Sequence, residues 1–201
     1  MSRVMRLALA CLTALSLVAC SSGDEPEPSA SASVTSTLPA GELRPRVLQP
    51  DEVSSSLVPI DAQTGTRDLD AIAAFSADPA TAKKSLQDHG FQSAYVVQYA
   101  DPAKGAVVTN VVTKFATASG ATADLTADLA ASGSTGTTFA VTGLGEQAGG
   151  VRGKLDPTLA EGTLITLRWR VGDTTWLLAV GARNPVDESA VRRLADKLTG
   201  R

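Results

Sequence analysis

Two apolar runs on either side of Gly172-Asp173 constrain the fold of this chain more than any other segment. A Gly-Asp pair between alternating runs predicts an antiparallel β-hairpin with a two-residue turn. Slipping the register by one residue would mix apolar and polar side chains on both faces. The register without a slip places four pairs on one face: Ile165 with Val180, Leu167 with Leu178, Trp169 with Trp176 and Val171 with Thr174.

The opposite face of this hairpin carries two arginines, Arg168 and Arg170, on one strand. One interpretation is a solvated sheet face, or ion pairs with a helix. The other is a docking patch for an anionic ligand or an envelope protein, because guanidinium groups fork onto carboxylates and phosphates. Arg168 and Arg170 are therefore the candidate partner-binding residues, and the face also holds Thr166, Thr175, Leu177 and Ala179, with Arg152, Lys154 and Arg183 expected nearby.

A second hairpin is predicted over residues 91–115, turning at 101–105. Alternation places Phe91, Tyr95, Val97 and Tyr99 on one face of the first strand. The return strand is expected to place Val107, Val111 and Phe115 on one face, and Asn110 and Lys114 on the other. Aromatic residues at strand spacing usually pack in a core, as we expect for Tyr95, Tyr99, Trp169 and Trp176.

Three helices carry clear end signals. Asp78 and Pro79 begin one that runs to about Asp88, with Leu86 inward and Gly90 after its end. A second covers 119–132 and buries Ala121, Leu125 and Leu129. The last follows Asn184 as N-cap and Pro185, with a buried stripe of Ala190, Val191, Leu194 and Leu198.

Weaker signals fill the rest of the domain: a short helix at 49–53, a loop or edge strand at 58–60, a weak helix at 68–76 and a strand near Phe139 and Val141. The order is helix, two strands, helix, three strands, helix. Short turns between strands indicate an antiparallel sheet. The prediction is a single α+β domain over 41–201, with helices packed against a sheet built from hairpins.

The N-terminus begins with Arg3 and Arg6, followed by an apolar run over 7–18. That run is too short to span a bilayer, which takes about 20 residues, and it fits a signal peptide. Leu17-Val18-Ala19-Cys20 resembles the lipobox of bacterial lipoproteins. The resemblance implies that residues 1–19 are a signal peptide, that cleavage precedes Cys20, and that a diacylglycerol on Cys20 anchors the protein to the outer face of the cell membrane. An ordinary secretory signal is the alternative.

Residues 20–40 are rich in Ser, Pro and Ala and are expected to form a disordered tether behind the lipidated Cys20. The only cysteines are Cys11 and Cys20, so the domain folds without a disulfide. Losing Arg3 and Arg6 leaves 16 basic against 21 acidic residues, a net charge of −5. This acidic balance argues against nucleic-acid binding.

No catalytic signature is present in the sequence. His89 is the only histidine, lies at a predicted helix end, and is expected to have a capping or surface role. Serines lack the Gly-x-Ser-x-Gly pattern, and no Cys/His set fits a metal. Three carboxylate pairs, Asp68/Asp70, Asp124/Asp128 and Asp187/Glu188, are interpreted as solvated or capping residues. We expect no cofactor, no metal and no enzymatic activity.

The run Gly143–Gly150 lacks dinucleotide-binding spacing and opens no helix. We interpret it as a mobile loop that links strands, with the rim of a ligand pocket as the alternative.

Four segments carry a diffuse resemblance over about residues 45–200: 90–91, 115–117, 143–148 and 168–172. In that order they are similar to PsbP-like actinobacterial lipoproteins and to extracellular sensor-type domains of actinobacterial membrane kinases. The resemblance implies an antiparallel sheet flanked by helices and a binding role. The expected function is a non-enzymatic binding or sensor-like module. The alternatives are a carrier of lipid or small apolar ligands with a sheet–helix cavity and, third, an envelope hydrolase.

Overall fold

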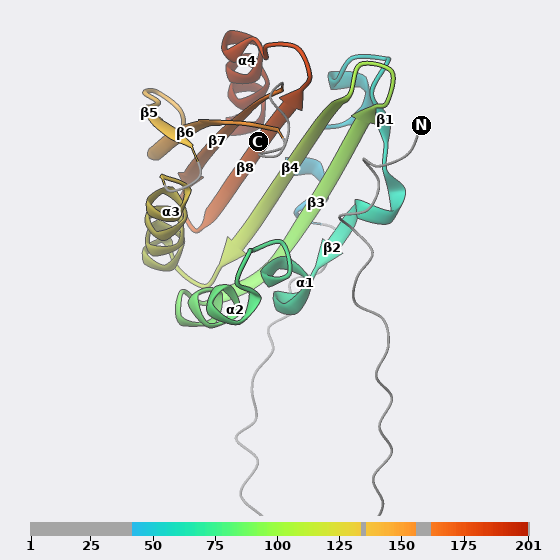
Figure 1. The fold of residues 1–201 in the computed structure, drawn as a ribbon. Helices are drawn as coiled ribbons and strands as arrows, with labels where there is room; N and C mark the ends of the chain where they lie inside the picture. The colour runs from blue at the N-terminus through green and yellow to red at the C-terminus, as the bar shows by residue number, and fades with distance from the viewer. Residues whose placement is uncertain (1–41, 134–135, 156–161, 201) are drawn as a thin grey trace, which may run out of the picture. The chain divides into compact units, whose positions relative to one another are not determined.

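The structure, a computed structural model, describes residues 42–133, 136–155 and 162–200. The predicted signal peptide, Cys20 and the tether over 20–40 lie outside these residues. The described chain forms one antiparallel sheet of eight strands with helices packed against it (Figure 1). This confirms the predicted α+β class.

The elements alternate between hairpins and helices along the chain. In order they are η1 (Arg44–Arg46), η2 (Pro50–Glu52), β1 (Val58–Pro59), η3 (Asp61–Gln63), β2 (Gly65–Arg67), α1 (Leu69–Ala73), α2 (Pro79–Asp88), β3 (Phe91–Asp101), β4 (Ala106–Phe115), α3 (Ala118–Ser132), β5 (Thr137–Ala140), β6 (Gln147–Gly153), β7 (Thr163–Val171), β8 (Thr174–Ala182) and α4 (Glu188–Thr199).

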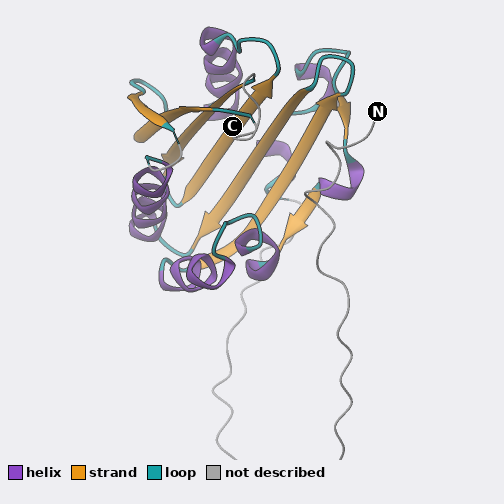
Figure 2. Cartoon of the chain, in the orientation of Figure 1, coloured by secondary structure: helices purple, strands orange, loops and turns teal. Residues whose placement is uncertain are grey.

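The sheet order is β1-β3-β4-β8-β7-β6-β5, with β2 also paired to β3. The long β3–β4 and β7–β8 hairpins form its centre (Figure 2). In β7–β8 every predicted pair is present, from Ile165 with Val180 to Val171 with Thr174. Gly172 has a φ of 58°, the left-handed conformation that a primed hairpin turn requires.

One face of the sheet carries the main hydrophobic core. Trp169 and Trp176 are buried there, together with Leu167 and Leu178. This face is covered by α4, by the segment before β1 and by Leu144 from the loop before β6. The buried residues of the covering segments are Leu43, Val47, Leu48, Leu144, Val191, Ala195 and Leu198.

The opposite face is covered by α1, α2 and α3 near the ends of the strands. A smaller apolar cluster lies there, formed by Phe115 of β4, Leu86 of α2, Ala121 of α3 and Ala73 of α1. Helices therefore lie on both faces of the sheet, but they cover the second face only in part, and different elements pack on the two faces.

A β-bulge corrects the predicted face of Phe91. The register shifts between Phe91 and Ser93, so Phe91 pairs with Phe115 and packs in the smaller cluster. Tyr95 and Tyr99 belong to the main core instead. The predicted alternation was wrong at this position because one extra residue in a strand inverts the face of everything before it.

Asn110 shares its face with buried residues. It lies in β4 between Val108 and Val112 and is fully buried. Its Oδ1 accepts a hydrogen bond from Leu48 N at 3.0 Å, and its Nδ2 donates to Leu177 O at 2.9 Å. The amide thus ties the segment before β1 to the sheet.

Two further predictions placed the boundary of an element at the wrong residue. The Gly-rich run is a loop only as far as Glu146, because Gln147–Gly153 forms strand β6 between β5 and β7. Four strands therefore follow α3, where three were predicted. The last helix begins after Asp187, whose side chain accepts from Ser189 N, so Asn184 is not its N-cap.

Candidate functional site

A cleft of about 540 Å³ lies on the face of the sheet that carries α1, α2 and α3. Its floor is formed by β4 and β8, through side chains such as Val111 and Leu177, and its walls by the helices. The volume falls in the range of small-molecule sites, roughly 300–1,000 Å³. The charged residues among those lining it are Asp124, Asp128 and Arg168.

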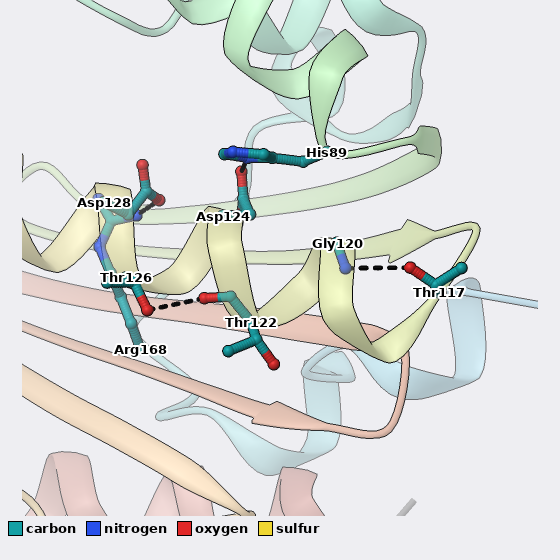
Figure 3. A network of polar contacts seen from close by, with 8 residues as sticks. All are labelled: His89, Thr117, Gly120, Thr122, Asp124, Thr126, Asp128 and Arg168. Atoms are coloured by element: carbon teal, nitrogen blue, oxygen red, sulfur yellow. Dashed lines mark hydrogen bonds and ion pairs between the residues drawn. The ribbon is translucent and has the colours of Figure 1, made fainter.

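The wall helices are positioned by local capping. Asp78 accepts a hydrogen bond from Thr81 N and starts α2, while Gly90 with a φ of 78° follows its end. Thr117 accepts from Gly120 N at 3.0 Å and starts α3 (Figure 3). Leu125, on α3 itself, is buried. These end signals place His89, the residue that follows α2, next to the second turn of α3.

His89 follows α2 directly, and its imidazole lies over the carboxyl of Asp124 on α3 (Figure 3). His89 Nδ1 and Asp124 Oδ1 are 3.7 Å apart, and both side chains are mostly buried. His89 Nδ1 has no hydrogen-bond partner in the described part of the chain. His89 is the C-cap residue of α2, so the expected capping position is confirmed, whereas the alternative of a surface role is wrong because its ring is mostly buried between two helices.

Asp124 is a desolvated carboxyl. Its side chain is 14% exposed, and burial raises its pKa to about 6, against a smaller lowering by the positive charge of Arg168. No hydrogen bond to its carboxylate is present among the described residues. The interpretation of Asp124/Asp128 as a solvated pair is therefore wrong for Asp124.

Arg168 reaches from β7 to α3, where its Nη1 pairs with Asp128 Oδ2 (Figure 3). Its side chain is 19% exposed, and its Nε is buried without a hydrogen-bond partner in the described segments. Burial lowers the pKa of the guanidinium, and Asp124 opposes this. The interpretation of this sheet face as solvated is therefore wrong, because α3 covers it. The structure has the other expected arrangement, an ion pair between the arginine and a helix.

Arg170, two residues further along β7, is also enclosed. Its side chain is 12% exposed, pairs with Glu146 Oε2 at 2.7 Å, and donates to Gly172 O. Glu146 also accepts from Gly172 N, which lowers the pKa of this carboxyl. Arg170 therefore braces the β7–β8 turn. Binding of an external partner by Arg168 or Arg170 remains a prediction.

The other predicted carboxylates have structural positions. Asp68 caps α1, Asp70 pairs with Lys83, Asp187 caps α4 and Glu188 pairs with Arg152. Within the described ranges, no group of three or more His, Cys, Asp or Glu could hold a metal ion. No helix among those residues is long and apolar enough to cross a membrane.

The sequence suggested a sheet–helix cavity only as the carrier alternative, and no residue was assigned to it. The one signal available was the position of Asp124 and Asp128 on α3, each beside the buried stripe of Ala121 and Leu125. Acids that flank such a stripe lie where the helix meets the sheet. Arg168 alternates with Trp169 along β7, so it lies on the opposite face of the sheet, where it can pair with these acids.

Comparison with protein-family models and with curated proteins finds no match to this chain. Among solved structures, the fold is similar to the crystal structure of the extracellular domain of PknH from Mycobacterium tuberculosis, with a TM-score of 0.53 and 13% sequence identity. The similarity covers 83% of this chain and 100% of that domain. At this identity it shows a shared fold. The predicted resemblance to extracellular domains is confirmed at that level, whereas the lipobox and the PsbP-like resemblance stay predictions.

Proposed function

We propose that the protein is a non-enzymatic, sensor-like binding module of the cell envelope, which takes a small amphipathic ligand in the cleft between the sheet and helices α1–α3. The observation that carries this proposal is Asp124, a largely buried carboxyl at the wall of the cleft, to which none of the described residues donates a hydrogen bond. Such a group lowers stability when it ionises, and perturbed groups of this kind concentrate at functional sites.

The rest of the site supports binding over catalysis. A histidine base works through a hydrogen bond to its nucleophile. No described side chain hydrogen-bonds to the His89 ring, whose neighbour is a carboxyl. The extracellular location of the PknH domain supports a place outside the cytoplasm for this chain. Anchoring through a lipid on Cys20 is the remaining part of the proposal.

The cleft can be tested by filling it. Val111 and Val107 lie on the same strand and face of the sheet, but only Val111 is among the residues that line the cleft. We suggest the full chain with Cys20→Ala as background, because it carries no acyl chain and needs no detergent. Nile red, a neutral apolar dye, is the probe.

We expect saturable Nile red binding in the background chain and with Val107→Trp, and loss of binding with Val111→Trp. Equal binding by the two tryptophan variants would contradict the cleft as the ligand site.

A lipid carrier is the second candidate, and one observation favours it: apolar side chains supply much of the cleft lining, including Ile72, Leu86, Val111, Leu125 and Leu177. Acyl lipid that co-purifies with the Cys20→Ala chain, and that Val111→Trp removes, would favour the carrier over the sensor-like module.

A further inference from the structure

The ligand class follows from how charge is distributed around the cleft. This step rests on the proposed function, since it concerns the ligand of the same site. Arg168 is already paired with Asp128 through Nη1. Asp124 has no such partner in the described part of the chain: its ion-pair neighbour there is His89 at 3.7 Å, beyond hydrogen-bond length. With Asp124 ionised, the three charged lining residues sum to a net negative charge.

The surrounding charges do not change this balance. On the α1–α2 side, Lys83 pairs with Asp70 at 2.6 Å, and Lys84 pairs with Asp88 at 2.6 Å. Both ion pairs are exposed to solvent, and in each of them the lysine charge is already neutralised by an aspartate. The groups that face Asp124 are therefore His89 after α2, Asp128 on α3 and Arg168 on β7.

An anionic head group is a poor fit for this arrangement. It would have to displace Asp128 from Arg168, and it would then lie near a second carboxylate, Asp124. A wholly apolar ligand fits the walls but would leave the Asp124 carboxylate without a donor in an even drier site, which is costly. A cationic head with N–H donors supplies both the missing charge and the missing hydrogen bonds.

We propose that the cleft binds a small hydrophobic ammonium compound, whose N–H groups donate to Asp124 and whose apolar body lies along Val111 and Leu177. Leu125 and Leu86 close the same space from the helices. Asp124 is then the specificity-determining residue, because it selects the charge of the head group, while the walls select an apolar body.

The proposal has a definite pH dependence. An alkylamine stays protonated below about pH 10, whereas Asp124 ionises near pH 6 because burial raises its pKa. Binding of the ammonium should therefore strengthen as the pH rises through about 6. An anion would show the opposite trend, since ionised Asp124 repels it.

The experiment uses isothermal titration calorimetry on the full Cys20→Ala chain with three probes of equal length: octylamine, octanoate and octanol. At about pH 7.5 we expect octylamine to bind at least about tenfold more tightly than octanoate. Asp124→Asn keeps the shape of the side chain and should weaken octylamine binding about tenfold, while the binding of neutral octanol should not weaken. Asp88→Asn, on the exposed end of α2, is the matched control and should change nothing.

The outcomes separate the two proposals. If octanoate binds more tightly than octylamine, or if Asp124→Asn leaves their ratio unchanged, the cationic ligand class is wrong while the cleft stays a binding site. If none of the three probes binds, the proposed function fails as well. Should Asp124→Asn not fold, octylamine affinity of the Cys20→Ala chain between about pH 5 and 7.5 decides: a flat or falling profile overturns the inference.

Discussion

Trp169 and Trp176 stack across the β7–β8 hairpin with ring centroids 5.9 Å apart and planes inclined by 5°. Both rings are buried in the main core. Trp176 Nε1 also donates to Arg46 O at 3.2 Å, which ties the segment before β1 to the sheet. The pair therefore joins the centre of the sheet to the chain that packs over it.

Truncating this pair should be among the most damaging core changes. Trp176→Ala removes a large buried ring and its hydrogen bond, so we expect a loss of about 3–5 kcal/mol in the free energy of unfolding, measured by denaturant titration. Val58→Ala on the exposed edge strand β1 is the control and should cost less than about 0.5 kcal/mol. A loss below about 1 kcal/mol for Trp176→Ala would contradict its place in the core.

The Trp pair shows what local sequence can predict. Alternation on both strands and a Gly-Asp turn agree on one register, and a slip would expose every core residue at once. The ends of α2 were predictable for a similar reason. Asp78, Pro79 and Gly90 each act on backbone groups within one turn, so no distant residue is needed to interpret them.

Strand β6 shows where such inference fails. Glycines at 149 and 150 indicate a loop by composition, yet both lie in a strand of the sheet that is paired on both sides. A Cβ at Gly149 would crowd Leu129 of α3, and one at Gly150 would overlap the Phe139 ring. The glycines are there to admit neighbours that are adjacent only in the folded chain.

The candidate site depends on the same kind of distant contact. His89 follows α2, Asp124 lies on α3 and Arg168 on β7. Nothing in any one of these segments predicts that Asp124 is largely buried, because its burial follows from how the helices meet over the sheet.

Asn110 offers a second test of the core. Replacing it with Ala leaves Leu48 N–H and Leu177 C=O each without a side-chain partner in a buried place. We expect Asn110→Ala to cost about 2 kcal/mol or more, measured by denaturant unfolding. Gln98→Ala removes a single hydrogen bond to Thr109 in a half-buried position and should cost less. Equal losses would mean that the Asn110 bridge contributes little.

Charge reversal of Arg168 should destabilise the domain. Arg168→Glu would place a third carboxylate against Asp128 and Asp124 beneath α3. Breaking a buried pair typically costs about 3–5 kcal/mol. Arg192→Glu reverses an exposed pair with Asp196 on α4, and its effect on thermal unfolding should be far smaller. If adding Asp128→Arg to Arg168→Glu restores no stability, the two residues do not act as a pair.

The predicted lipid anchor can be tested independently of the domain. If Leu17-Val18-Ala19-Cys20 is a lipobox, Cys20→Ala should move the protein from the membrane fraction to the medium. Mass spectrometry of the wild-type N-terminus should then show an acylated Cys20. Two or more acyl chains are needed for stable attachment. An unmodified N-terminus at any other residue would contradict the anchor.

Asp124 gives the sharpest prediction of stability against pH. Burial raises the pKa of this carboxyl from 3.8 in the unfolded chain to about 6, so the folded state holds the proton more tightly. The stability that the protonated carboxyl contributes is fully present below about pH 4 and is lost as the pH rises through about 6. Asp124→Asn cannot ionise and escapes this loss. We therefore expect Asp124→Asn to raise the free energy of unfolding at about pH 7 by as much as about 3 kcal/mol, with no gain at about pH 4.

Asp78 should behave in the opposite sense, because hydrogen bonds from Thr81 lower its pKa. Its carboxylate contributes stability above about pH 4, which falls away in acid. Denaturant unfolding of Asp124→Asn and Asp78→Asn across this range would show whether the two curves diverge from wild type in opposite directions. If Asp124→Asn instead loses stability at neutral pH, the carboxylate has a donor that compensates its burial. Asp124 would then need no ligand to supply a hydrogen bond.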